Sequence, residues 1–202
     1  MKKAAFFAAT LFATASLFAA PRSYNVTSDG KNYAMFTSEA TLETIHGRTT
    51  NVTGTIAADP ANVTGSTVDV TIDLASLDTG IGMRNDHMKN KFLQVDKFPS
   101  ATFKSVSVSG PKTIVANTPA EVQVTGDLTI HGVTKRITVP VHVIAIPESD
   151  RTKAGRGPGE WLHATTDFNV KLTDFGIAVP ETLVMKLSDA LTIHLDLFAN
   201  AK

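Results

Sequence analysis

The nine residues DLTIHGVTK, at positions 127–135, carry the clearest local signal in the chain. Apolar and polar residues alternate on both sides of His131-Gly132, as they do in a strand with one buried face. Glycine readily adopts the positive φ that a two-residue turn requires. The stretch therefore predicts a β-hairpin that turns at His131 and Gly132.

The same alternation recurs along the rest of the chain beyond residue 20. Runs rich in Val, Ile and Thr are separated by Gly, Pro, Asn and Asp, which favour turns. In residues 191–197 the odd positions are Leu, Ile, Leu and Leu and the even ones are Thr, His and Asp, so one face is buried and the other is solvated. We expect strands at residues 34–42, 52–58, 68–74, 101–108, 122–130, 133–146, 161–170 and 191–199, with a further short strand near 24–27.

Two stretches depart from this alternation. Residues 78–98 carry Met88 and Phe92 four positions apart, which is the spacing of one helical face. They predict a short amphipathic helix that ends before Pro99. Residues 147–160 combine Arg, Lys, Gly and Pro, and we expect them to form a polar loop.

The strand pattern leaves two architectures open. Amphipathic strands of this number can close into a barrel, which removes exposed sheet edges, and an eight-stranded barrel either fills with its own side chains or holds one small ligand. The inferred inward positions are mostly Val, Ile, Leu, Ala, Ser and Gly, and such small residues leave interior volume unfilled. A flattened two-sheet sandwich with a packed core gives the same alternation. An outer-membrane barrel fits poorly, because aromatic side chains are too few for two interfacial girdles.

The first residues have the composition of a targeting signal. Met1-Lys2-Lys3 and the apolar, small-residue run that ends at Ala20 are typical of a secretory signal peptide. The rival interpretation is a membrane anchor, but the run is short for a hydrocarbon core of about 30 Å and no positive cluster follows it. We expect a signal peptide at residues 1–20, cleaved within a few residues of that end, and one domain at residues 21–202, in a periplasmic or secreted protein.

Charge and motif content argue against several function classes. Lys plus Arg and Asp plus Glu both number 19, and no basic stripe with interleaved aromatics is present, so we expect no nucleic-acid partner. The sequence has no cysteine, no Gly-x-Ser-x-Gly elbow, no His-Glu-x-x-His motif and no glycine-rich phosphate loop. We therefore expect a protein that is not an enzyme and that has no metal site and no catalytic cofactor.

Six short motifs follow one another between residues 77 and 189. They are LDTG at 77–80, RNDHMK at 84–89, FPSATFKS at 98–105, GDLTIHGVTK at 126–135, DFGI at 174–177 and LSD at 187–189. In this order they resemble the YceI-like family of bacterial exported proteins, often described as polyisoprenoid-binding or lipocalin-like. Two positions depart from the family pattern, since Asn85 stands where Asp is usual and Lys171 where Arg is common.

The resemblance implies an all-β fold, namely an eight-stranded antiparallel lipocalin-like β-barrel with a short helix near one mouth and an interior apolar tunnel. It also implies a bound polyisoprenoid, quinone or fatty-acyl amphiphile, and a homodimer, because family members are often dimeric. Burial of ten methylenes contributes about 8 kcal/mol at about 0.8 kcal/mol each, from which association costs of about 4 kcal/mol or more are subtracted. We therefore expect a ligand chain longer than ten carbons.

In a hollow barrel, the inward positions of the strands are the candidate ligand contacts. The positions that we expect to line the tunnel are Phe36, Leu42, Val70, Ile72, Phe103, Val124, Leu128, Val141, Phe168, Ile193 and Leu195. Apolar residues of the helical stretch and its end are candidates for an adaptable lid, because Met tolerates varied partners. They are Met83, Met88, Phe92 and Phe98.

Two polar residues of the helical stretch, Arg84 and His87, have two interpretations. They can contact the polar head group of a ligand at the tunnel mouth. Alternatively, Asp86 caps the helix and Arg84 ties it to the barrel through hydrogen bonds. The sequence leaves both open.

Two functions fit these observations. The first is a carrier that holds a long apolar molecule for transport, storage or sequestration. The second, which the setting of the resembled family suggests, is a protein-interaction module that works with a membrane redox partner, such as a cytochrome b-type protein, with a tunnel that is structural or delivers quinone.

Overall fold

A computed structural model describes residues 21–201, so the predicted signal peptide lies outside the described residues. Ten strands are present in this part of the chain: β1 Arg22–Val26, β2 Tyr33–Glu39, β3 Thr44–Thr49, β4 Val52–Ala58, β5 Thr67–Asp73, β6 Ser100–Ser109, β7 Ala120–Ile130, β8 Val133–Ile146, β9 Glu160–Lys171 and β10 Ala190–Ala201. The helices are α1 Gly82–His87, which continues into a π-helical turn at Met88–Phe92, and α2 Asp150–Arg156. Short 3₁₀ turns lie at Val63–Gly65, Leu74–Ser76, Thr173–Phe175 and Glu181–Leu183.

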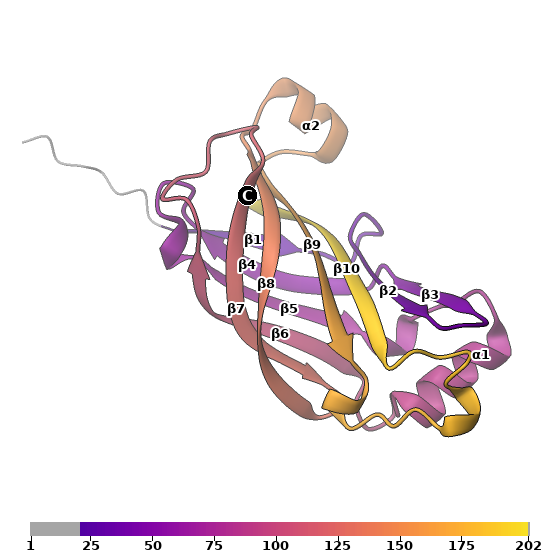
Figure 1. Cartoon of the computed structure of the whole chain (residues 1–202). Helices are drawn as coiled ribbons and strands as arrows, with labels where there is room; N and C mark the ends of the chain where they lie inside the picture. The colour runs from indigo at the N-terminus through magenta and orange to yellow at the C-terminus, as the bar shows by residue number, and fades with distance from the viewer. Residues whose placement is uncertain (1–20, 202) are drawn as a thin grey trace, which may run out of the picture.

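All ten strands form one antiparallel sheet that closes into a barrel (Figure 1). Both β1 and β2 pair with β10, while β4 pairs with β1 and β3 pairs with β2. Thus β1 with β2, and β3 with β4, act as two interrupted strands, and the ten segments occupy eight positions around the barrel. The predicted eight-stranded antiparallel barrel is confirmed, and the sandwich is excluded.

A buried side chain closes the break between β1 and β2. Asn32 is only 1% exposed. Its Oδ1 accepts a hydrogen bond from the backbone N of Phe198 in β10 at 2.6 Å, and its Nδ2 donates to the carbonyl of Thr27 at 2.8 Å. The amide thus satisfies backbone groups that would lack a ladder partner where the strand is interrupted.

Strand β3 has no counterpart among the expected strands. Its six residues, TIHGRT, include Gly47 at a buried position, and glycine gives no apolar signal. The strand expected at 34–42 ends instead at Glu39, because the chain turns there: the backbone N of Ala40 donates to the carbonyl of Glu43 at 3.0 Å.

The hairpin between β7 and β8 is confirmed. Ile130 and Val133 are register partners, and the two residues between them both have positive φ, 51° at His131 and 75° at Gly132. Positive φ at both central residues is the geometry of a type I′ turn, whose twist matches that of the flanking strands.

The polar loop expected at residues 147–160 is wrong, because the segment contains α2. Ser149 Oγ accepts a hydrogen bond from the backbone N of Thr152, and Thr152 Oγ1 accepts one from the backbone N of Ser149, which is a capping box. Glu148 forms an ion pair with Lys153 at 2.8 Å. The polar residues therefore stabilise a short helix over one end of the barrel (Figure 1).

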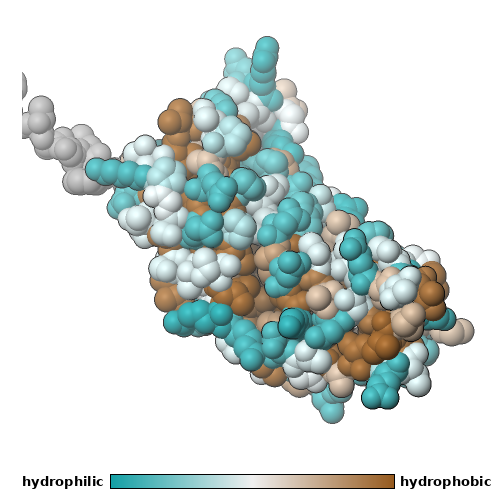
Figure 2. Space-filling model, in the orientation of Figure 1, coloured by the Kyte–Doolittle hydropathy of each residue, from teal (hydrophilic) through white to brown (hydrophobic). Residues whose placement is uncertain are grey.

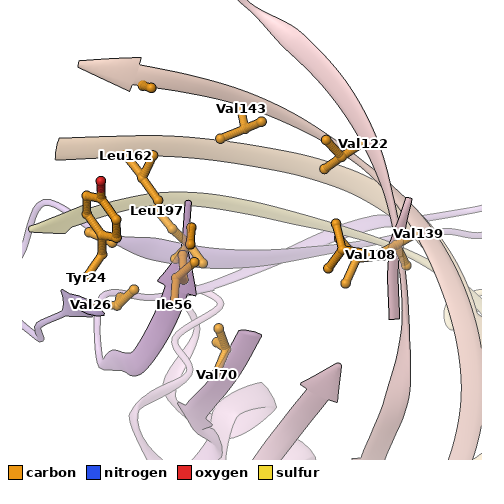
Figure 3. Close-up of a cluster of buried hydrophobic side chains, with 14 of the residues drawn as sticks. Tyr24, Val26, Ile56, Val70, Val108, Val122, Val139, Val143, Leu162 and Leu197 are labelled. Carbon is orange, nitrogen blue, oxygen red and sulfur yellow. The ribbon is translucent and has the colours of Figure 1, made fainter. Parts of the chain in front are cut away.

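The main core cluster fills the end of the barrel toward α2. Nine of the strands, all but β3, contribute buried side chains to it, and Figure 3 shows that the labelled ones point inward. Most are Val, Leu and Ile, whose burial stabilises the fold by about 1.5–3 kcal/mol each. The opposite end, toward α1, is lined by two smaller clusters and contains more open volume.

Candidate functional site

The barrel interior contains two adjoining cavities. The larger, of about 610 Å³, lies toward α1, and the smaller, of about 130 Å³, lies among the side chains of the main core cluster. The small cavity is walled mainly by inward-facing apolar residues of the strands. The large cavity is walled by apolar residues of the strands and, in larger number, by residues of α1 and of the turns and segments at that end. Four side chains line both cavities and so stand between them: Ile72, Ala101, Leu128 and Phe168.

Among the residues that line the large cavity, the polar ones are found only at one end. They belong to α1, to the turn between β2 and β3, and to the segments at 79 and 186, all of which lie at the α1 end (Figure 1). We call this end the mouth. The arrangement can bury an apolar chain in the strand-walled interior and leave a polar group beside Glu43, Thr79, Arg84, His87 and Lys186.

The hydrogen bonds of Arg84 tie α1 to the barrel. Its Nη1 contacts Oε1 of Glu43 at 2.7 Å, its Nε donates to Oγ1 of Thr79 at 2.9 Å, and its Nη2 donates to the carbonyl of Thr79 at 2.7 Å. All three guanidinium nitrogens are therefore engaged within the protein. His87 is exposed at the same mouth and is the better placed of the two residues to meet a head group.

The predicted cap by Asp86 is wrong. Asp86 lies inside α1, where its carboxylate is past the free N–H groups of the first turn, and the residue at the cap position is Ile81. The segment before α1 is held by Asn85 instead. Its Oδ1 accepts hydrogen bonds from the backbone N and the Oγ1 of Thr79, both at 2.8 Å, and its Nδ2 donates to Oδ1 of Asp78 at 2.7 Å.

The pKa of Asp78 is lowered, chiefly by the hydrogen bond from Asn85 and then by one from the backbone N of Gly80. A lowered folded pKa means that the ionised carboxylate stabilises the fold above the usual value of about 3.9 and that this stabilisation is lost as the pH falls through the folded pKa. We expect Asn85→Asp to raise the pKa of Asp78, because the new carboxylate cannot donate and repels its neighbour. The variant should lose more stability at neutral pH than in acid, where both groups are protonated.

A side-chain NMR titration of Asp78 measures this effect directly. Asp127 is an internal control, because its pKa is lowered by a hydrogen bond from Arg136 and should not change. An Asp78 pKa that is the same in both proteins would contradict the role of Asn85.

The structure places all but two of the sequence-predicted residues on the cavity walls. Those on the small cavity are Val70, Ile72, Phe103, Val124, Leu128, Val141, Phe168 and Leu195. Those on the large cavity are Phe36, Met83, Arg84, His87, Met88, Phe92 and Ile193, together with Ile72, Leu128 and Phe168 from the first set.

The two exceptions are Leu42 and Phe98. Leu42 is 67% exposed, because it lies in the turn after β2 and not in a strand. The ring of Phe98 packs outside both cavity walls against His131, with 4.5 Å between ring centroids, in space that Gly132 leaves open by having no Cβ.

The segment that covers the α1 end was not predicted from the sequence. It runs from the end of β9 to the start of β10, and its apolar residues have no regular period. The DFGI motif within it was the available signal, since Phe175 is 3% exposed and Ile177 is 2% exposed. The residues of this segment that line the large cavity are Leu172, Phe175, Ile177, Leu183, Lys186 and Leu187.

Histidines on the outer face of β9 and β10 are partly buried and paired, rather than simply solvated. His163 Nε2 lies 2.9 Å from Oδ1 of Asp196, and His194 Nδ1 lies 2.8 Å from Oδ1 of Asp167. Among the described residues, no group of three or more His, Asp or Glu side chains is arranged to hold a metal ion. Within residues 21–201, no helix has the length and apolarity needed to cross a membrane.

Comparisons with known proteins agree with this architecture. The model of the YceI-like domain matches residues 24–199. The chain is 35% identical over 141 residues to protein YceI of Escherichia coli O157:H7, covering 68% of this chain and 69% of that protein. It is 34% identical over 140 residues to a UPF0312 protein of Vibrio cholerae serotype O1, covering 67% of this chain and 66% of that protein's length.

A solved structure shares the fold. It is a polyisoprenoid-binding domain from Saccharophagus degradans that is implicated in plant cell wall breakdown. It matches with a TM-score of 0.66 at 20% identity, covering 90% of this chain and 99% of that chain. The closed barrel, the ordered motifs and the match over residues 24–199 establish that this chain belongs to the YceI-like family.

Proposed function

We propose that the barrel binds one long apolar molecule, with a slender tail in the small cavity, a body in the large cavity and a polar end at the mouth. The observation that carries this proposal is the pair of adjoining apolar cavities, which share the side chains between them. The same fold in a domain described as polyisoprenoid-binding supports it. The ligand classes that fit are a polyisoprenoid, a quinone and a fatty-acyl amphiphile.

The role that follows is that of an exported carrier, not of an enzyme. A carrier of this kind shields its ligand from water in the periplasm or outside the cell, for transport, storage or sequestration. The polar groups that line the large cavity gather at the mouth, and the best connected of them, Arg84, is engaged by Glu43 and Thr79. This arrangement supports binding, since catalysis needs convergent titratable groups at a reacting atom.

Native mass spectrometry of the full-length gene product tests the proposal. We expect protein exported through its own signal, and purified without detergent, to lose about 20 N-terminal residues, as a secretory signal peptide would. We also expect it to carry a discrete additional mass that organic extraction removes. A clean apo mass that also refuses added polyprenols, quinones and fatty acids would contradict the carrier function.

A second candidate function, docking on a membrane redox partner such as a cytochrome b-type protein, is favoured by one observation. Exposed apolar side chains gather beside the mouth, where Figure 2 shows a hydrophobic area at the α1 end. The backbone N of Leu42 donates to the carbonyl of Met185 at 2.8 Å, so the turn after β2 and the segment before β10 are neighbours there. The exposed residues are Leu42, Ile81, Met83, Val184 and Met185.

Pull-down from solubilised membranes separates the two functions. A docking partner should be lost with the surface pair Leu42→Ser and Met185→Ser, which line neither cavity, but kept when the interior pair Phe103→Trp and Ile193→Trp blocks the cavities. Loss with the interior pair alone would favour ligand delivery. The predicted homodimer is tested on the same proteins by light scattering, because a dimer that uses this surface should dissociate in the surface variant.

A further inference from the structure

Two phenylalanine rings that line the cavities lie over glycines of a neighbouring strand. Phe36 of β2 is the register partner of Gly47 in β3, and a Cβ built on Gly47 would lie less than 3.0 Å from three carbons of that ring. Phe103 of β6 covers Gly126 of β7 in the same way. Phe36 lines only the large cavity, and Phe103 only the small one.

The missing Cβ lets each ring lie against the barrel wall. Gly47 is itself buried, and the three atoms nearest to its added Cβ all belong to the Phe36 ring. Any side chain at this position would therefore push the ring away from the wall. The open side of the ring is the large cavity, so the ring would move into the ligand space. At Gly126, by contrast, an added Cβ would also meet the carbonyl oxygen of Lys104, which cannot move aside.

The difference in size between the two cavities indicates which ligand shape the wider, large cavity fits. The large cavity has about 610 Å³ and the small one about 130 Å³. An unbranched chain thin enough for the small cavity would leave part of the large one empty, and empty space next to a ligand forfeits dispersion contacts. A ligand whose body carries branches or rings would fill the large cavity better.

We propose that Gly47, by letting the Phe36 ring lie flat, sets the width of the large cavity and selects ligands with a branched or ring-bearing body over unbranched chains. This inference rests on the proposed binding function and adds the residue that determines which ligand shape the large cavity accepts.

Phytanic acid and palmitic acid are suitable probes, because they share one main chain and differ by methyl branches. The delipidated protein should bind phytanic acid at least about tenfold more tightly, given that buried methyl groups each add to affinity. Gly47→Ala should weaken phytanic acid about tenfold and palmitic acid less than about threefold, since width is lost and length is kept. Adding Phe36→Leu to Gly47→Ala should restore phytanic acid binding.

Two further variants complete the test. Gly155→Ala is the matched control, because it adds a methyl group to α2 in open space, and it should leave both affinities unchanged. Phe36→Trp places a larger ring over the unchanged Gly47, so it should give the same selective loss and answers the question even if Gly47→Ala folds poorly. Equal losses for both acids, or no loss for phytanic acid, in Gly47→Ala and Phe36→Trp would overturn the role of Gly47. A wild-type protein that binds neither acid would instead contradict the proposed function.

Discussion

Ile193→Trp should weaken the binding of a long apolar ligand about a hundredfold. Ile193 lies on β10 between its register partners Phe36 of β2 and Phe168 of β9, and all three line the large cavity. The indole exceeds the isoleucine side chain by the volume of roughly two methylenes, whose lost burial amounts to about 1.6 kcal/mol, and crowding against Phe36 and Phe168 adds about 1–3 kcal/mol. A total of about 3 kcal/mol is about two powers of ten in Kd. Titration of the delipidated protein with a fluorescent long-chain amphiphile measures the change.

The matched control for this variant is Val106→Trp. Val106 lies on β6, is 55% exposed and lines neither cavity, so the same new side chain there should leave Kd within about twofold of wild type. Both variants should keep the far-ultraviolet circular dichroism of a β-barrel. An unchanged Kd in a folded Ile193→Trp protein would show that the ligand does not occupy the large cavity.

Asn32→Ala should lower the free energy of unfolding by about 2–4 kcal/mol, because two part-buried backbone groups lose their partners at about 1–3 kcal/mol each. These groups are the N–H of Phe198 and the carbonyl of Thr27, at the break between β1 and β2. Urea denaturation of the ligand-free protein measures the change as a lower midpoint.

Asn32→Asp separates the two hydrogen bonds. The aspartate keeps an acceptor for the N–H of Phe198 but has no donor for Thr27, so both variants should be destabilised through different groups. Ser28→Ala is the nearby control, because the hydrogen bonds of Ser28 are solvent-exposed and their loss should cost little. If Asn32→Ala unfolds at the wild-type midpoint, Asn32 does not hold the interrupted strand in place.

The strands and the cavity walls were largely predictable from the sequence, because both depend on a period of two. Alternate residues of a strand share one face, and this alternation predicted Val70, Val124 and Leu195 as inward-facing. All three line the small cavity. The prediction was wrong where the chain leaves a strand. Leu42 fits the alternation of β2 but follows its last residue, so its side chain is exposed.

Barrel closure was not readable from the same pattern. It depends on the pairing of β1 with β10 through Asn25–Asn200 and Val26–Ala199, which are far apart in the sequence and mostly not large apolar residues. The tie between Arg84 and the barrel was one of the two interpretations that the sequence left open, but its partner Glu43, which lies 41 residues away, could not be named from the sequence. The resemblance of motifs supplied what local periodicity could not, although it did not reveal that two of the eight strands are interrupted.

The position of the small cavity behind the large one, on the side away from the polar residues of the mouth, has a kinetic consequence. A ligand that leaves through the mouth withdraws its tail last, so the transition state for release has lost the contacts of the tail with the small cavity. Each methylene held there slows dissociation roughly fourfold, as follows from about 0.8 kcal/mol per group. The residence time of the ligand should therefore grow geometrically with tail length until the small cavity is full and then level off. The longest residence time is thus set by the depth of the barrel.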